Sequence, residues 1–292
     1  MLAGIEAGGT KFVCGVGSGP NDLKTASFPT SAPEVTLANV IQFFRETAAD
    51  RIEAVGIGSF GPVDLDRQSR TFGYITSTPK AGWRDFDLAG TVREALRVPV
   101  EFDTDVNAAV LGEARWGAAR GLSDAIYLTI GTGIGGGAIV HGQVVHGMVH
   151  PEMGHLRIPH DLKRDPFPGI CPYHKDCLEG LACGPAMQAR WGAPAGTLPP
   201  DHPAWLLEAH YLALGLVNLT VTLSTERILL GGGVMQQPQL FDLVRNEFAM
   251  LLNGYVQHPN VLTGLEDFIG PPQLGNQAGI LGSLVLAERA RA

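Results

Sequence analysis

Apolar and turn-forming residues alternate along the chain in a way that predicts one strand arrangement twice. Leu2–Ala7 and Ala125–Ile130 are short apolar runs, and each leads through a glycine-rich turn into a second run, Phe12–Val16 or Ala138–Val140. An apolar run of this length next to glycine predicts a strand, so each copy is a predicted β-hairpin. The copies begin roughly 120 residues apart, which indicates a duplicated fold rather than a short solenoid repeat.

The remaining segments extend this pattern into an α/β chain. Apolar residues at helical spacing predict helices, and short apolar runs with few charges predict further strands. The helices are placed at Val35–Ala49, Ala108–Ala118, Pro203–Ser224, Pro238–Asn253 and Gln277–Arg291, and the strands at Ile52–Gly58, Val98–Phe102 and Arg227–Leu230. We therefore expect two lobes, residues 1–119 and 120–292, with the last helix packing back on the first lobe.

The stretch of residues 141–201 is irregular and rich in glycine, proline, histidine and cysteine. A loop this long inside a compact chain is usually functional or held by a metal. It contains a Cys-x2-His-x2-Cys run, Cys171–Cys177, whose sulfur and nitrogen atoms suit a tetrahedral Zn²⁺ site. The alternative is a set of buried thiols. The fourth ligand stays open between His155, His160 and Cys183.

Composition and charge exclude several classes of protein. The net charge is −8, from 21 basic and 29 acidic residues, which argues against broad nucleic-acid binding. Backbone N–H groups and a metal can still hold phosphates without net positive charge. The N-terminus lacks a basic, apolar signal sequence, and no apolar stretch is expected to span a bilayer. We therefore expect a cytoplasmic protein with reduced thiols and no membrane partner.

The glycine turns do not match the common nucleotide fingerprints. Gly56–Gly61 and Gly131–Gly136 have the spelling of a dinucleotide motif, but a turn follows the first and a strand follows the second, where that motif needs a helix. A Walker A loop is absent, since Lys11 follows Thr10 and precedes a strand. The duplicated hairpin turns instead suit phosphate binding by successive backbone N–H groups. The alternative is a pair of ordinary tight hairpins.

A cluster of carboxylates follows one predicted strand and precedes a helix. Asp103, Asp105 and Asn107 lie at this junction, where side chains are well placed for chemistry. Phosphoryl transfer to a hydroxyl needs a carboxylate that orients the hydroxyl and takes its proton. The alternative is that these residues only cap the helix. Asp103 could be structural, and Asn107 is the candidate N-cap.

These motifs together resemble the ROK family of sugar kinases, within the actin-like and hexokinase-like ATPase superfamily. Gly4–Lys11 resembles the first phosphate motif of that family, Gly131–Gly137 the second, and Gly231–Val234 the adenosine motif. The resemblance runs nearly end to end. It implies two actin-like (ribonuclease H-like) ATPase lobes with a central cleft and a zinc-stapled loop.

The resemblance also implies roles for individual residues. It makes Asp105 the general base and Glu6 a ligand of Mg²⁺ through water, whereas Thr104 stands where the family often has asparagine. The implied sugar ligands are Asn107, Glu152, His155, Glu179 and Gly61. The implied phosphate and nucleotide contacts are Gly8, Gly9, Thr10, Lys11, Gly131, Thr132, Gly133, Gly232 and Gly233. The implied zinc ligands are His155, Cys171, His174 and Cys177.

The implied activity is transfer of the γ-phosphate of Mg–ATP to a hexose. The metal-ligand spacing and the His150–His155 motif look like the fructokinase branch, which points to D-fructose as acceptor and fructose 6-phosphate as product. Glucose, mannose and N-acetylmannosamine are the alternative acceptors. A sugar-sensing transcriptional regulator is the alternative of a different class, although no DNA-binding module precedes the first motif. Family habit implies a homodimer.

Overall fold

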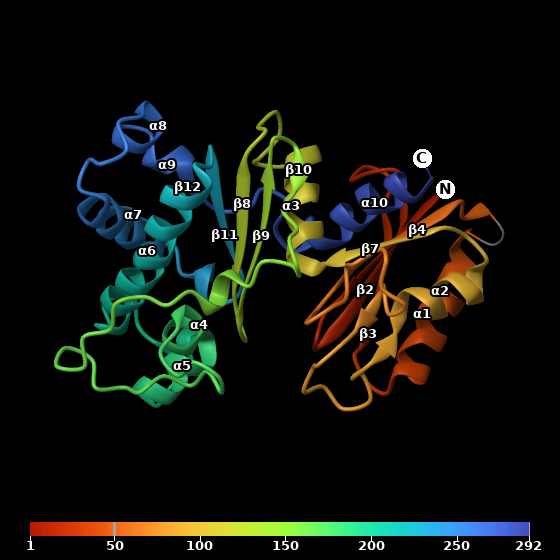
Figure 1. Cartoon of the computed structure of the whole chain (residues 1–292), viewed down its shortest axis with the longest axis horizontal. Helices are drawn as coiled ribbons and strands as arrows, with labels where there is room; N and C mark the ends of the chain where they lie inside the picture. Colours follow the sequence, from red (N-terminus) through yellow and green to blue (C-terminus); the bar gives the residue numbers. More distant parts are fainter. Residues whose placement is uncertain (49–50, 292) are drawn as a thin grey trace. The chain divides into compact units, whose positions relative to one another are not determined.

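The computed structural model describes residues 1–48 and 51–291, and these form two compact units. The first unit comprises residues 1–121, 144–151 and 273–292, and the second comprises residues 122–143 and 152–272. Figure 1 shows both chain ends in the first unit. The predicted division had placed residues 144–151 in the second lobe, whereas the structure groups them with the first unit, although Val144 also ends strand β10 (Gln143–Val144) of the second sheet.

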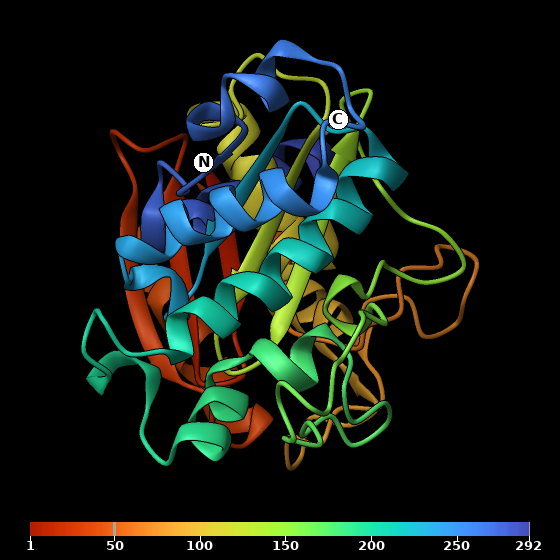
Figure 2. The same cartoon turned by 90° about the vertical axis from the view of Figure 1, so that its left-hand side faces the viewer.

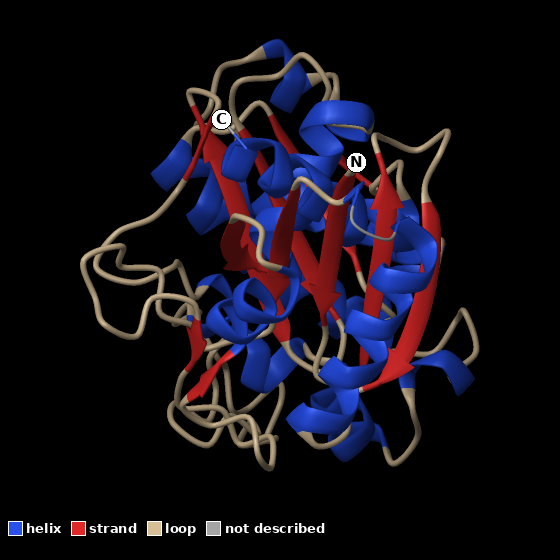
Figure 3. Cartoon of the chain, turned by 90° about the vertical axis from the view of Figure 1, so that its right-hand side faces the viewer, coloured by secondary structure: helices blue, strands red, loops and turns tan. Residues whose placement is uncertain are grey.

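The first unit is built on a five-stranded sheet in the order β3-β2-β1-β4-β7. β1 is antiparallel to β2 and parallel to β4, and β4 is parallel to β7. Figure 3 shows these strands side by side with helices packed against the sheet. The strands are β1 Leu2–Ala7, β2 Lys11–Gly17, β3 Lys24–Pro29, β4 Ala54–Ser59 and β7 Val100–Thr104. A small hairpin of β5 Tyr74–Ile75 and β6 Phe86–Asp87 lies outside this sheet.

Helices bury both faces of the first sheet. One face packs against α1 and α2 around Phe12, Phe44 and Trp83, which are fully buried. The other face packs against α10, whose Leu281 and Leu284 are buried with Leu2. The bounds are α1 Pro33–Ala48, α2 Leu88–Leu96, α3 Asp105–Trp116 and α10 Ala278–Arg291. The predicted end of the first helix at Ala49 lies outside the described residues.

Glycines let the last helix approach the first sheet closely. A Cβ on Gly56 of β4 would lie 1.9 Å from the carbonyl oxygen of Ser283, and one on Gly282 would lie 1.6 Å from that of Ala108. Any side chain at these positions would push α10 away from β4 and α3. This close packing places the C-terminal helix in the first unit.

The second unit repeats the same sheet order, β10-β9-β8-β11-β12. β8 is antiparallel to β9 and parallel to β11, which is parallel to β12. The strands are β8 Ala125–Ile130, β9 Ile134–Val140, β10 Gln143–Val144, β11 Arg227–Gly231 and β12 Ile269–Gly270. The predicted α/β class with a duplicated fold is confirmed. β9 begins at Ile134, so the second glycine turn is shorter than the predicted Gly131–Gly137.

Two long helices lie across the second sheet in Figure 2, and shorter helices lie within the region predicted to be irregular. That region contains the short helices α4 and α5, which the sequence pattern did not reveal. The long helices are α6 Ala204–Leu223 and α7 Gln239–Leu252, and the short ones are α4 Leu178–Ala182, α5 Gly184–Trp191, α8 Pro259–Leu262 and α9 Leu265–Phe268.

Helix α6 corrects one expectation from the sequence. Its 20 residues are long and apolar enough to cross a membrane by length and composition, which the sequence analysis had not expected of any stretch. More than half of its apolar window is buried, at 56%. Trp205, Tyr211 and Leu216 are among its buried side chains. This burial is that of a core helix of the second unit.

Candidate functional site

The carboxylate site of the first unit lies where β7 passes into α3. Thr104 has extended backbone angles, φ −71° and ψ 155°, and its Oγ1 accepts a hydrogen bond of 3.1 Å from the N–H of Asn107. Thr104 is therefore the N-cap. The prediction of Asn107 as N-cap is wrong, because the helix already begins at Asp105. Asp105 lies in the first helical turn, where the helix dipole stabilises a carboxylate.

Asn107 is oriented by a buried neighbour. Its Nδ2 donates to Oδ1 of Asp103 at 2.7 Å, and the N–H of Thr104 donates to the same oxygen at 2.7 Å. Asp103 and Asn107 are both buried, and Oδ1 of Asn107 has no hydrogen-bond partner. A buried amide oxygen without a partner is costly unless a ligand supplies a donor. Asn107 is therefore suited to accept a hydrogen bond from a hydroxyl group.

Glu6 lies at the end of β1, in register with Gly58 of β4. Burial, and after it the nearby Asp105 carboxylate, raise the pKa of Glu6 to about 7, although Lys11 acts in the opposite direction. Its Oε2 is buried without a partner. A divalent cation near two carboxylates favours the ionised form of both. These residues fit an Mg²⁺ ion, which takes oxygen ligands and retains water.

The first glycine turn joins β1 to β2. The N–H of Gly8 donates to the carbonyl of Lys11 at 3.0 Å, and a Cβ on Gly8 would lie only 2.8 Å from that oxygen. Thr30 braces the turn, since its Oγ1 donates to the carbonyl of Gly8 at 2.7 Å and its N–H to that of Thr10 at 2.9 Å. Nothing lies within 4 Å of the position of a Cβ on Gly9. The turn thus presents open backbone to a ligand.

The second glycine turn joins β8 to β9 and is braced by different elements. The N–H of Gly131 donates to the carbonyl of Gly133 at 2.9 Å, and the N–H of Gly184 at the start of α5 donates to the carbonyl of Gly131 at 2.8 Å. Glu179 accepts from the N–H of Ile134 at 2.9 Å. A carboxylate therefore lies directly against this turn, close to the predicted phosphate-binding backbone.

The third glycine motif follows β11. Gly232 has φ +92°, and a Cβ there would lie 2.3 Å from the carbonyl oxygen of Ile130. Only glycine fits both the backbone angle and the close approach. The Cβ position of Gly233 is open. The predicted adenosine motif therefore lies beside the end of β8, next to the second glycine turn.

Four side chains of the second unit form a candidate metal centre. One ligand atom from each of His155, Cys171, His174 and Cys177 lies within 4.8 Å of every other. His155 Nδ1 is 3.7 Å from Cys171 Sγ and 3.5 Å from Cys177 Sγ, and His174 Nδ1 is 3.7 Å from Cys171 Sγ. Zinc bonds of about 2.3 Å to sulfur and about 2.0 Å to nitrogen place such atoms about 3.5 Å apart in a tetrahedron. The spacing fits a tetrahedral metal.

The other candidates for the fourth ligand lie elsewhere in the second unit. His160 is bonded to the carbonyl of Asp165 at 3.0 Å, and Cys183 is the N-cap residue of α5. Burial, then the neighbouring Cys171 and Glu179, raise the pKa of Cys177 to about 11. A bound cation would lower this pKa again, because metal binding favours the thiolate over the thiol.

Glu179 connects the candidate metal centre to the second glycine turn. Its Oε1 lies 4.0 Å from Nε2 of His155, while Nδ1 of His155 faces the two cysteine sulfurs. A carboxylate near the far nitrogen of a metal-binding histidine orients the ring. Glu152 is exposed and precedes the 3₁₀ turn Met153–His155. A Cβ on Gly154 of that turn would lie 1.9 Å from the carbonyl oxygen of Ile134.

Two histidines of the first unit were missed by sequence reasoning, which assigned no role to either. His150 is buried, and its Nε2 accepts from the N–H of Val63 at 3.3 Å, next to Gly61. His146 Nε2 lies 2.9 Å from Oδ2 of Asp103. Both contacts span distant parts of the sequence, so no local motif marks them.

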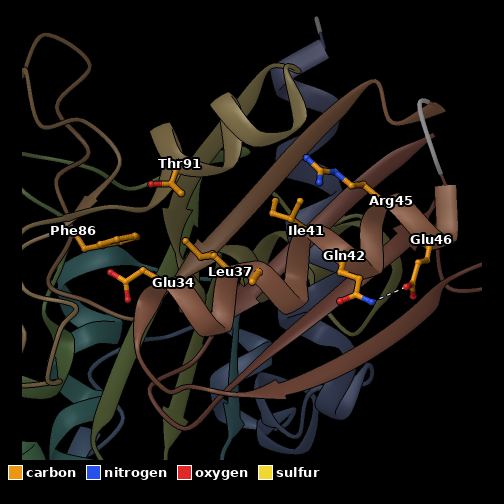
Figure 4. A pocket seen from close by; sticks show the side chains of 9 residues that line it. Glu34, Leu37, Ile41, Gln42, Arg45, Glu46, Phe86 and Thr91 are labelled. Carbon is orange, nitrogen blue, oxygen red and sulfur yellow. Dashed lines mark hydrogen bonds between the residues drawn. The ribbon is translucent and has the colours of Figure 1, made fainter.

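A hollow of about 830 Å³ also lies in the first unit, between α1 and α2. Figure 4 shows Leu37, Ile41 and Phe86 in this hollow, with the hydrogen bond from Gln42 to Glu46 along its edge. None of the residues that line it was predicted to bind substrate, nucleotide or metal.

The fold and the site define an α/β protein of the actin-like ATPase class with a His/Cys cluster that can bind a metal. The ROK family model matches residues 2–290, and the chain belongs to the ROK family. A fructokinase from Lactococcus lactis subsp. cremoris is 44% identical, covering 97% of this chain and 95% of its own length. A fructokinase from Pediococcus pentosaceus is also 44% identical, and the match covers 99% of this chain and 98% of that protein. The crystal structure of ROK hexokinase from Thermus thermophilus matches with a TM-score of 0.79 and 29% sequence identity. The match covers 99% of this chain and 98% of the hexokinase chain.

Proposed function

We propose that this protein is an ATP-dependent sugar kinase that transfers the γ-phosphate of Mg–ATP to D-fructose, forming fructose 6-phosphate. The observation that carries the kinase assignment is the carboxylate of Asp105 at the start of α3, beside Glu6 and the buried oxygen of Asn107. The choice of fructose rests on four relatives named fructokinase, which are 41–44% identical to this chain.

Asp105 is the proposed general base. It accepts the proton of the sugar hydroxyl as that oxygen forms a bond to the γ-phosphorus and the bond to the β-phosphate oxygen breaks. The N-terminus of α3 is a favourable place for this negative charge because of the helix dipole. Asn107 accepts a hydrogen bond from a second sugar hydroxyl. In this proposal Gly61, Glu152, His155 and Glu179 complete the sugar contacts.

The phosphates are proposed to bind the glycine turns. Gly8, Gly9, Thr10 and Lys11 offer backbone N–H groups, a hydroxyl and an ammonium group. The second turn offers Gly131, Thr132 and Gly133, and the adenosine lies on Gly232 and Gly233. A bound Mg²⁺ ion would neutralise phosphate charge, and Glu6 is the residue that would hold this ion, through water as the family resemblance implies.

The metal of the His/Cys cluster is proposed to be a structural zinc ion. Two cysteine and two histidine ligands suit Zn²⁺ in a closed tetrahedral site, which leaves no position for substrate. Its role is to hold residues 155–177 in place and so orient Glu179 through His155. A cytoplasmic location and a homodimer complete the proposal. Both follow the family resemblance.

Phosphorylation of another hexose is the second candidate. A glucokinase from Streptomyces coelicolor is 28% identical to this chain over 99% of its length. The fructokinases are more similar, so glucose is the weaker choice.

A coupled assay of ADP release tests the proposal with fructose, glucose, mannose and N-acetylmannosamine as separate acceptors. We expect the highest kcat/KM with fructose and a product phosphorylated at the 6-hydroxyl, identified by NMR. Glucose as the preferred acceptor would overturn the choice of sugar. ADP release that does not depend on any sugar would overturn the kinase assignment. Elemental analysis of the purified protein should find about one zinc per chain, as expected for one four-ligand site.

A further inference from the structure

Residues 144–151 are attached to the first unit by two histidines. His146 contacts Asp103 at 2.9 Å, and His150 contacts the N–H of Val63 at 3.3 Å. Between them, Met148 and Val149 are exposed. Since the apolar residues of this loop tip are not buried, the polar contacts of the two histidines hold the loop.

The contact of His146 continues through Asp103 to a proposed sugar ligand. Oδ2 of Asp103 faces His146, and Oδ1 accepts from Nδ2 of Asn107 at 2.7 Å. Since Nδ2 of the amide is committed to Asp103, its Oδ1 must point the other way. That oxygen is buried and has no hydrogen-bond partner. The chain of contacts therefore sets which end of the Asn107 amide a sugar meets.

We propose that Asp103 and His146 are a positioning pair for the acceptor sugar: His146 holds Asp103, and Asp103 turns the Asn107 amide so that its oxygen accepts from a sugar hydroxyl. The pair touches neither the reacting atoms nor the nucleotide. It acts through Asn107 and selects a hydrogen-bond donor at one position of the sugar. This inference rests on the proposed sugar kinase activity.

The charges around His146 support this arrangement. The hydrogen bond to Asp103 is the largest influence and raises the pKa of His146, while partial burial opposes it. Two cations also face the imidazole and lower its pKa, Arg289 of α10 and Arg67 of the loop between β4 and β5. The contact with Asp103 outweighs them. The imidazolium form is thus favoured while Asp103 is ionised, and it is lost as the pH rises through the raised pKa.

The loss of charge with pH gives a signature that a purely structural contact would not give. In the wild type, KM for the sugar should rise as His146 loses its proton, because a neutral imidazole holds Asp103 less strongly than an imidazolium does. KM for Mg–ATP should not follow the same curve.

The test compares His146→Gln with Asp103→Asn, and uses His141→Gln as a matched control on an exposed residue of the second unit. For each protein, kcat, KM for fructose and KM for Mg–ATP are measured from pH 6 to pH 9. We expect both variants to raise KM for fructose about tenfold, as for one lost charge-assisted hydrogen bond. Their kcat and KM for Mg–ATP should stay within about twofold, and the rise of KM for fructose with pH should disappear.

Unchanged KM for fructose in His146→Gln, or the same rise with pH as in the wild type, would overturn the proposal. So would equal changes in both KM values. His146 is 43% exposed, so its substitution should fold even if the buried Asp103→Asn does not. A wild type that phosphorylates no sugar would remove the proposed function and this inference together. An active wild type with unaffected variants would remove this inference alone.

Discussion

The two glycine hairpins share one topology but have different surroundings. In the first unit, titratable side chains lie close to the turn, and the pKa of Glu6 is raised to about 7 by burial and Asp105. In the second unit, Glu179 accepts a hydrogen bond from the backbone N–H of Ile134 at the turn. The other oxygen of this carboxylate lies 4.0 Å from His155 of the His/Cys cluster. The duplicated fold thus supplies two similar backbone turns, and the added side chains give them different chemistry.

The second unit also differs in how its loop is held. Asp165 accepts from the Tyr211 hydroxyl at 2.7 Å and lies 3.2 Å from Nε of Arg190. The Arg190 guanidinium lies over the ring of Phe167, 4.4 Å from its centroid. This loop is therefore anchored by buried polar contacts and by the candidate metal centre. In the first unit, an apolar core that includes Ile5, Ile57 and Phe102 packs under the strands that lead to the site.

The largest effect is expected from a substitution of Asp105, which should remove the chemistry of the first unit and leave its fold intact. Asp105→Asn should lower kcat by about 10²–10⁴-fold, because an amide cannot accept the hydroxyl proton. Fructose binding by calorimetry and the circular dichroism spectrum should change little. Asp66→Asn is the matched control, since Asp66 is exposed in the same unit and its carboxylate accepts from the nearby Gln68 N–H. Wild-type kcat in Asp105→Asn would refute its role as base.

Sequence reasoning located the first strand of each duplicated hairpin because the signals of these strands are local. The strand Leu2–Ala7 and the strand Ala125–Ile130 were predicted with the bounds that the structure has. Asn107 was misjudged as a cap because capping depends on the backbone angles of Thr104, which the residue type alone does not determine. The roles assigned to individual site residues remain predictions.

Long-range contacts lay beyond sequence reasoning. Cys171, His174 and Cys177 follow a local spacing, whereas His155 lies 16 residues before Cys171 and could not be chosen over His160 from spacing. The pair of His146 and Asp103 spans 43 residues and joins a loop to a strand end. Only the folded backbone brings such residues together.

The next largest effect is expected from loss of the metal that supports the loop of the second unit. Cys177→Ser should reduce the metal content from about one ion per chain toward zero and lower Tm by about 5 °C, because a ligand to the loop is lost. KM for fructose should rise more than kcat falls. Inductively coupled plasma mass spectrometry and a thermal melt measure these effects.

Cys183→Ser is the matched control, because Cys183 is a buried cysteine of the same unit that is not in the cluster, and it is the N-cap residue of α5, where serine is favoured. It should keep its metal and its Tm. Loss of metal in Cys183→Ser, or a full metal content in Cys177→Ser, would show that the ligand set is wrong.

A smaller effect tests the raised pKa of Glu6. With a pKa of about 7 in the free protein, Glu6 is mostly protonated at pH 6 and mostly ionised at pH 8. Mg²⁺ needs the ionised form, so the Mg²⁺ concentration for half-maximal activity should fall about tenfold from pH 6 to pH 8. Glu6→Gln should need more Mg²⁺ at every pH and lose this dependence, whereas Glu6→Asp should keep it.

The raised pKa of Glu6 also predicts that stability falls as the pH rises. A salt-bridged carboxylate, whose pKa is lowered, would have the opposite effect. Because the folded pKa lies above the usual 4.5, the metal-free protein should lose stability from this group as the pH rises from about 4.5 through about 7. Glu6→Gln removes that loss. Urea unfolding of both proteins at pH 5 and pH 8 measures it, and an equal pH effect on the two would contradict the assignment.

The smallest effect concerns the contact between Glu179 and the second turn. A Cβ on Gly133 would lie 2.6 Å from Oε2 of Glu179, whereas the first turn has an open position at Gly9. Gly133→Ala should displace the flexible Glu179 carboxylate from the N–H of Ile134. We expect KM for fructose and for Mg–ATP to change by about two- to fivefold, which corresponds to part of the free energy of one hydrogen bond. Gly196→Ala is the control, because its Cβ would meet nothing within 4 Å. If both variants had wild-type kinetics, the carboxylate would have no role at that turn, and the two hairpins would be more alike than their surroundings indicate.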